Sequence, residues 1–165
     1  MTTEADYTTN EWQLLARMPA LVALAVMLTE ASQRRGRKDE LATLATVTEE
    51  IAPEYAENAL VQSLLPEVKA TVTSGEMKEY AKAKQTDKAL TVALQWSAQI
   101  NDLLAHKSTP VETEGYKRFV LHTGYQVAAA SADAEFLGIG GATISLGERK
   151  TLLSLVDALQ VDFDY

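Results

Sequence analysis

Apolar residues recur at helical spacing along almost the whole chain, and no stretch alternates with the period of two that a half-buried strand shows. In the first part of the sequence the apolar positions are Leu14, Leu15, Met18, Leu21, Val22, Ala25 and Val26, followed by Leu41, Leu44, Val47 and Ile51. The stripe returns in Trp96 to Leu103, Phe119 to Ala134 and Leu152 to Leu159. Because such helices bury one face against one another, the sequence predicts an all-α fold of about six or seven helices.

The size and composition of the chain are those of one globular domain. Its 165 residues are enough to bury a continuous apolar core, and 47% of them are hydrophobic against 23% charged. Because cysteine is absent, the chain holds no disulfide, thiol nucleophile or thiolate metal site. We expect a single helical domain over residues 1–165.

The formal charge of −8 bears on the partners of the protein. Nucleic acids and anionic lipid surfaces are bound through clusters of lysine and arginine, so this charge disfavours both. The one basic run, Arg34 to Lys38, is followed at once by Asp39 and Glu40, which is typical of a solvated turn. The amino-terminal residues do not resemble a secretory signal, and the longest apolar run, Met18 to Leu28, is too short to span a bilayer. We expect a cytoplasmic protein that binds no nucleic acid and does not insert into a membrane.

Local signals predict where several helices begin. Ser145 followed by Glu148, and Thr109 followed by Pro110 and Glu112, match the capping box that opens a helix.

Prolines and polar residues mark further boundaries. Thr9 or Asn10 can cap the first helix, and Pro53 and Pro66 suit first-turn positions. Pro19 lies inside the first apolar stripe and lacks the donor that an interior position requires, so we expect it to kink or split that helix.

The two ends of the chain follow the same course, in residues 12–51 and 116–159, with a variable helical middle over 53–108. Within that middle, Glu67 to Gln85 has few large apolar residues, so any helix there should be mostly exposed and the least stable element. The matched positions are Val22 with Val127, Glu30 with Glu135, Glu40 with Glu148, Leu44 with Leu152, Val47 with Leu155 and Ile51 with Leu159.

Each copy is predicted to be an amphipathic helical hairpin that is unstable alone and packs against the other copy. Small residues at Gly124, Ala128 and Ala132, loosely matched by Ala16, Ala20 and Ala23, would let the paired helices approach closely. Any two amphipathic hairpins look alike, but the joint match of glutamates and leucines favours a duplication.

Each copy resembles the helix, acidic turn and Glu-bearing helix of the tellurite-resistance TerB-like family, most distinctly in FLGIGGATISLGE within Val127 to Leu159. The resemblance covers about half of the chain. Where the family often has Ala-Asp-Gly at the turn, this chain has Ala31, Ser32 and Gln33 in the first copy and Ala132, Asp133 and Ala134 in the second. The resemblance implies an all-helical, acidic protein associated with metal or oxyanion stress, which binds divalent cations through surface carboxylates.

Residue patterns for common catalytic sites are absent. The two histidines, His106 and His122, have no glutamate three residues before them, which excludes the usual ferritin-type di-iron site, and neither HExxH nor a nucleophile elbow occurs. His122 shares its helix with Tyr116, Phe119 and Tyr125, where a packed or surface histidine is the commoner outcome.

Four glutamates remain as candidate metal ligands, and they are related by the duplication: Glu30, Glu40, Glu135 and Glu148. They fall at the turn ends of their hairpins, so folding could bring them to a common edge, where their oxygens would suit calcium or magnesium. The alternative is structural, because a glutamate at a helix start stabilises the helix through capping or the helix dipole.

These observations favour a non-enzymatic, TerB-like stress-associated protein that binds a partner protein, with divalent-cation binding as an additional possibility. One alternative is a ligand-free structural or homo-oligomerisation module, suggested by an exposed Trp12 and by the tail, where Val161, Phe163 and Tyr165 alternate with acids. The tail itself is expected to be a frayed terminus or a docking peptide. A third possibility is an enzyme that uses His122 or Tyr125 in a cavity between the hairpins.

Overall fold

The computed structural model describes residues 2–29, 37–79, 86–135 and 144–164, and within them every regular element is helical. The α-helices are α1 (Thr9–Leu28), α2 (Arg37–Ile51), α3 (Ala59–Thr73), α4 (Thr86–Lys107), α5 (Pro110–Glu135) and α6 (Leu146–Leu159). Three short 3-10 helices accompany them, η1 (Glu4–Asp6), η2 (Ala52–Tyr55) and η3 (Glu76–Glu79). The predicted all-α fold is therefore confirmed.

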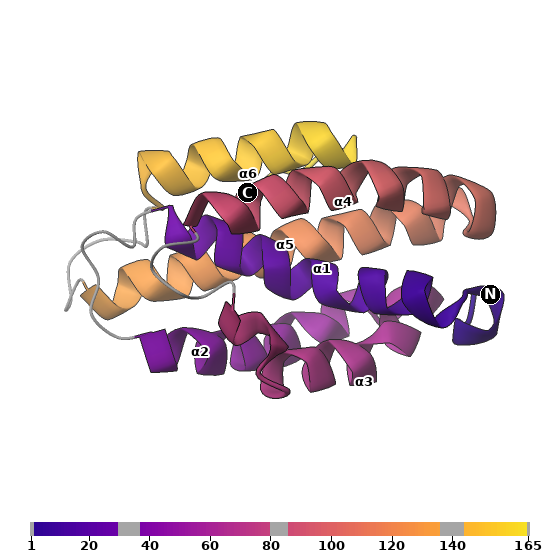
Figure 1. Cartoon of the computed structure of the whole chain (residues 1–165), viewed down its shortest axis with the longest axis horizontal. Helices are drawn as coiled ribbons and strands as arrows, with labels where there is room; N and C mark the ends of the chain where they lie inside the picture. The colour runs from indigo at the N-terminus through magenta and orange to yellow at the C-terminus, as the bar shows by residue number, and fades with distance from the viewer. Residues whose placement is uncertain (1, 30–36, 80–85, 136–143, 165) are drawn as a thin grey trace.

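Helix α1 is the core of the bundle. It packs against α3, α4, α5 and α6, and Figure 1 shows α4 and α6 on one side of it and α2 and α3 on the other. From Met18 to Leu28 every residue is buried, as expected for a helix that is apolar all round.

By length and composition α1 could cross a bilayer, which corrects the expectation from the shorter run of Met18 to Leu28. However, 78% of its apolar window is buried inside the bundle, which is what the core helix of a globular domain requires.

Pro19 neither splits nor ends α1, which runs unbroken from Thr9 to Leu28. Since proline has no N–H, the carbonyl of Leu15 loses the hydrogen bond that residue 19 would donate in a helix. The hydroxyl of Tyr116, on α5, donates to this same carbonyl at 2.8 Å in a fully buried position. A side chain about a hundred positions away thus replaces the missing backbone donor. Of the two outcomes expected at Pro19, a kink or a split, the split is wrong.

The predicted helix starts are largely confirmed. Ser145 and Glu148 form the capping box of α6, and Thr109 with Glu112 caps α5 from Pro110 onward. The first helix is capped by Thr8 rather than Thr9 or Asn10, with Glu11 completing the box.

Of the two other prolines discussed, one has the predicted position and the other does not. Pro53 occupies the first turn of η2 as predicted, whereas Pro66 lies inside α3. Asn58 opens α3 in its place, accepting a hydrogen bond from Val61 N at 3.0 Å.

The two related segments pack on each other, but α1 and α2 do not pack together as the predicted hairpin. Helix α1 packs most extensively with α5, while α2 lies against α5 and α3 and barely touches α1 among the described residues. Helix α6 packs on α4, α1 and α5. The predicted closeness of small residues holds at Gly124, where an added Cβ would stand 2.9 Å from Cγ1 of Val22.

The expected exposure is wrong for Trp12 and holds for most of the middle segment. Trp12 is only 5% exposed, because it packs against Tyr7 with 5.5 Å between ring centroids. In the segment from Glu67 to Gln85, most of the described side chains are exposed, as expected, whereas Val68, Val72 and Met77 are buried in the core. These three residues lie on the face of α3 and η3 that turns toward the bundle, and so few apolar residues are enough to anchor it.

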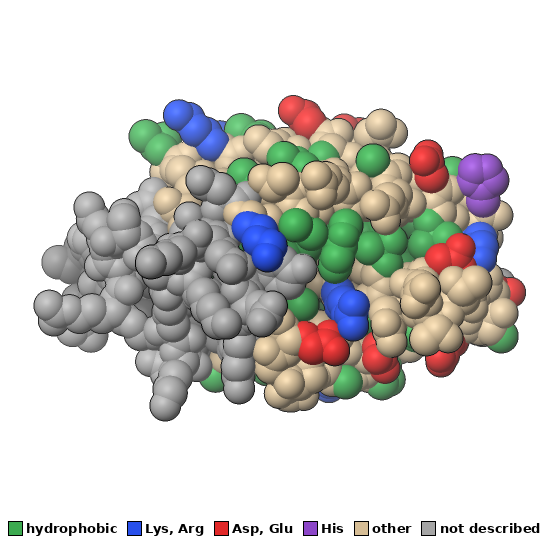
Figure 2. Space-filling view, in the orientation of Figure 1, with side chains coloured by type: hydrophobic (Ala, Val, Ile, Leu, Met, Phe, Trp, Pro, Cys, Tyr) green, Lys and Arg blue, Asp and Glu red, His purple; other side chains and the backbone are tan. Residues whose placement is uncertain are grey.

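Figure 2 shows hydrophobic side chains along a narrow band in the middle of one face, with basic and acidic side chains interspersed around it. The large hydrophobic side chains exposed in the described part of the chain are Val111, Leu146 and Leu153.

Candidate functional site

A surface pocket of about 280 Å³ is formed where η2, α5 and the C-terminal tail meet. Its lining residues are aromatic or polar: Tyr55, Arg118, His122, Tyr125, Asp162, Phe163 and Asp164. The tail residues Val161 and Phe163 pack against the core, so residues 161–164 are not the frayed terminus that the sequence suggested. The ordered tail supplies one wall of the pocket.

His122 is held from both sides by hydrogen bonds. The amide nitrogen of Gln126, one turn further along α5, lies 3.1 Å from Nε2, and the hydroxyl oxygen of Tyr55 lies 3.2 Å from Nδ1. A neutral imidazole has one donor and one acceptor nitrogen, and these two contacts engage both. Neither ring nitrogen is left to take a proton from a substrate.

Burial and charge set the protonation of the two central groups. Burial lowers the pKa of His122 below its ordinary value, and Glu54, whose Oε2 lies 4.0 Å from Nδ1, offsets this in part. Burial, assisted by the negative charge of Glu54, raises the pKa of Tyr55 to about 12. At neutral pH the pocket therefore presents a neutral imidazole and a neutral phenol.

The aromatic walls are fixed by packing. The ring of Tyr55 meets Phe119 of the core edge to face, with centroids 5.3 Å apart and planes at 76°. Phe163 stands 6.4 Å from His122, and Tyr55 stands 6.0 Å from it. The pocket is thus shaped before any ligand arrives.

The charged groups at the rim are mostly acidic. Asp162 and Asp164 are exposed on the tail, and Glu54 is exposed on η2. Arg118 is the one cation that lines the pocket in the described part of the chain, and Glu114 pairs with it at 2.7 Å.

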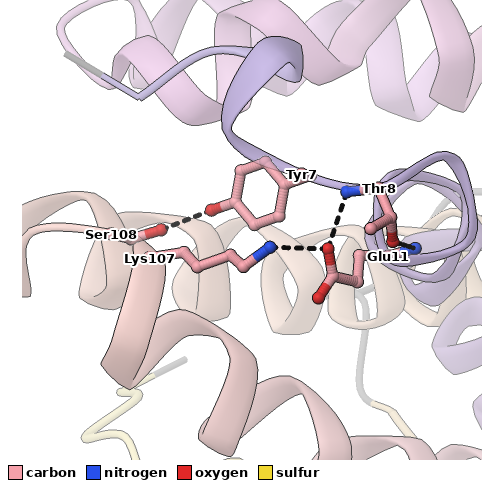
Figure 3. Close-up of polar contacts among 5 residues, drawn as sticks. All are labelled: Tyr7, Thr8, Glu11, Lys107 and Ser108. Carbon is pink, nitrogen blue, oxygen red and sulfur yellow. Dashed lines mark hydrogen bonds and ion pairs between the residues drawn. The ribbon is translucent and has the colours of Figure 1, made fainter.

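A second polar cluster ties the N-terminal segment to the turn between α4 and α5 (Figure 3). The hydroxyls of Tyr7 and Ser108 lie 2.6 Å apart, and Lys107 Nζ donates to Glu11 Oε2 at 2.7 Å. Hydrogen bonds from Lys107 and Thr8 lower the pKa of Glu11 to about 2.

The Tyr7 hydroxyl of this cluster is not a base that could activate Ser108, because burial raises the pKa of Tyr7 and keeps it protonated. We therefore assign the cluster to holding the N-terminal segment in place.

The four glutamates predicted as metal ligands are only partly described. Glu30 lies outside the described residues, and the same is true of the side chains of Glu40, in α2, and Glu135, the last residue of α5. Glu148 is 1% exposed, and its Oε2 accepts a hydrogen bond from Ser145 N at 2.8 Å, so it has the capping role that the sequence suggested.

The helix ends nearest to these glutamates in the sequence do lie together. Figure 1 shows the end of α1, the start of α2, the end of α5 and the start of α6 at the same end of the bundle. There the hydroxyls of Thr29 and Thr151 lie 2.9 Å apart. Among the residues whose side chains are described, no group of three or more histidine, aspartate or glutamate side chains is suited to a metal ion. With only Glu148 of the four described, the metal site stays a prediction.

Sequence reasoning found part of the pocket and missed the rest. His122 and Tyr125 were singled out as a possible cavity pair, and both line the pocket. Tyr55 and Arg118 were missed because no local pattern relates them to the tail. The alternation of aromatic and acidic residues in the tail was the one available signal for Phe163 and its neighbours.

Comparisons of the chain with protein-family models, with curated proteins and with solved structures found no match.

Proposed function

We propose that the chain is a non-enzymatic, stress-associated binding protein of the TerB-like kind, which acts in the cytoplasm and holds its partner at the pocket around His122. The observation that carries this proposal is the convergence of three aromatic rings, from Tyr55, Tyr125 and Phe163, on one preshaped surface pocket. Concave sites lined by aromatic side chains with a few placed polar groups are the usual form of a binding site. The resemblance to the TerB-like family supports the stress-associated role, and the chain's composition supports the compartment.

The protonation of the pocket favours binding over catalysis. A general base must have a free lone pair within reach of the substrate. Both ring nitrogens of His122 are engaged, Nε2 with Gln126 and Nδ1 with Tyr55, while Tyr55 keeps its proton at neutral pH. An enzyme that uses His122 would first have to break one of these contacts.

The test is a titration of the ¹⁵N-labelled protein with a small set of cationic, neutral and anionic compounds, followed by amide NMR. We expect saturable shifts confined to residues 54–55, 118–126 and 161–164 for at least one class. Tyr125→Ala should weaken that binding, while Leu153→Ala, which removes an exposed apolar side chain on α6, should not. A pocket that takes no compound at millimolar concentration would contradict the proposal.

Divalent-cation binding is a second candidate function, and the meeting of the helix ends nearest to the four glutamates in the sequence supports it (Figure 1). Calcium and magnesium prefer carboxylate oxygens of this kind. In an NMR titration with either ion, Glu40→Gln and Glu135→Gln should remove the response. Glu114→Gln should leave it unchanged, because this glutamate lies near the opposite end of α5, where it pairs with Arg118. Glu148 is unsuitable for this test, because its substitution would disturb the cap of α6. No shift below millimolar metal would exclude this function.

A further inference from the structure

The charged residues at the pocket rim determine whether a positive or a negative ligand is favoured. The carboxylates of Asp162 and Asp164 line the pocket, and Glu54 stands beside His122. Arg118 opposes them, but its charge is already paired with Glu114 at 2.7 Å. The local balance is therefore negative, and the chain as a whole carries a formal charge of −8, so the long-range field also attracts cations.

The aromatic walls of the pocket also favour a positively charged ligand. A cation over the face of a tyrosine or phenylalanine ring is attracted by the ring quadrupole, most strongly where water is partly excluded. Tyr55, Tyr125 and Phe163 supply such rings, and the imidazole of His122 adds no competing charge while it is neutral. Tyr55 is locked by Phe119 and by its contact with His122, so little ordering is required on binding.

The volume of the pocket limits the ligand. At about 280 Å³ it lies just below the range of most small-molecule sites, about 300–1,000 Å³. A compact ammonium or guanidinium group on a short alkyl stem fits this space.

We propose that the pocket formed by Tyr55, Tyr125, Phe163 and the tail aspartates binds an organic cation, either an ammonium or a guanidinium group of the size carried by a lysine or arginine side chain. This inference rests on the proposed binding function and specifies its chemistry. The tail aspartates compensate the charge, and the rings provide the surface on which the cation sits.

The experiment compares n-butylammonium with a neutral and an anionic compound that have the same number of carbon atoms, n-butanol and butyrate, in NMR titrations at low salt. We expect n-butylammonium to bind at least about fivefold more tightly than either, with shifts at residues 118–126 and 161–164. Asp162→Asn with Asp164→Asn should weaken the binding of n-butylammonium about fivefold or more. The matched control, Asp102→Asn with Asp157→Asn, removes the same charge from exposed positions on α4 and α6 and should change it less than about twofold.

Aromatic and charge contributions are separated by Phe163→Leu, which keeps an apolar side chain and removes the ring. Phe163→Leu should weaken the binding of n-butylammonium about threefold and leave the binding of n-butanol unchanged. Equal losses for both compounds would overturn the cation–π contribution and with it the proposal.

Two further titrations distinguish a cation on a partner protein from a free small molecule. The peptide Gly-Lys-Gly, with Gly-Gln-Gly as its control, stands for a partner protein, and n-butylammonium stands for a free amine. Tighter binding of the lysine peptide would support a protein partner with an exposed lysine, and tighter binding of the free amine would support a small metabolite. If butyrate or n-butanol binds as tightly as the cation, the cation proposal fails and the binding function stands. If nothing binds, both fail.

Discussion

The hydrogen bond from Tyr116 to Leu15 makes a specific prediction, because it replaces a donor that Pro19 removes. In Tyr116→Phe the carbonyl of Leu15 stays buried and loses its hydroxyl donor. In Pro19→Ala the helix regains a backbone donor to that carbonyl, so the hydroxyl is no longer needed. The two substitutions should therefore be strongly non-additive.

The magnitude follows from the burial of both groups. Tyr116 and Leu15 are fully buried, and leaving a buried acceptor unpaired costs about 1–3 kcal/mol. In a domain of this size we expect Tyr116→Phe to lower the melting temperature by about 2–4 °C for each kcal/mol. Pro19→Ala gains a helix donor but loses about 0.8 kcal/mol for each buried methylene of the proline ring. We therefore expect this substitution alone to change the free energy of unfolding little. With alanine at 19, we expect Tyr116→Phe to cost about 1 kcal/mol less than with proline.

Urea denaturation of the four proteins, followed by circular dichroism, measures the free energy of unfolding and hence the coupling. Tyr7→Phe is the matched control, since it removes a hydroxyl that bonds Ser108 rather than Leu15. It should cost the same with proline or alanine at position 19. If Tyr116→Phe is also equally costly in both backgrounds, the hydroxyl does not compensate for the proline and the reasoning is refuted.

The remaining predictions concern packing and pH. Gly115→Ala should destabilise the protein by about 1–3 kcal/mol in urea denaturation, because the new Cβ would clash with the Asn58 amide that donates to Glu112 O. No loss of stability would show that Asn58 moves freely. Burial alone would raise the pKa of Glu112, but hydrogen bonds from Thr2 and Thr109 lower it to about 2, so its stabilisation is complete above pH 4.5 and disappears as the pH falls toward 2. Glu112→Gln should make the acid denaturation curve flatter over that range, and an unchanged curve would count against this assignment. The pKa of His122 is lowered in the folded state, so the free energy of unfolding should decrease as the pH falls below 6.5, and His122→Gln should remove that component; a component that persists in the variant would assign the effect elsewhere.

Much of the site could not be predicted from sequence, although one of its elements was indicated. His122 and Tyr125 lie one turn apart on the same helix, so their proximity follows from helical geometry alone. Tyr55 precedes His122 by 67 positions, and Phe163 follows it by 41, so no local rule places either of them beside the histidine. The exposure of Trp12 was mistaken for the same reason, since its partner Tyr7 approaches through the fold of η1 rather than through helical spacing.

The sequence by itself determined that the chain is helical and where α5 and α6 begin, because helical period and capping depend on residues within a few positions of each other. Only the tertiary structure decided that Pro19 is tolerated, that the tail is ordered, and that α2 packs on α5 rather than on α1. These outcomes depend on donors, rings and apolar faces that meet across the bundle, and their positions are set by the packing of all six helices together.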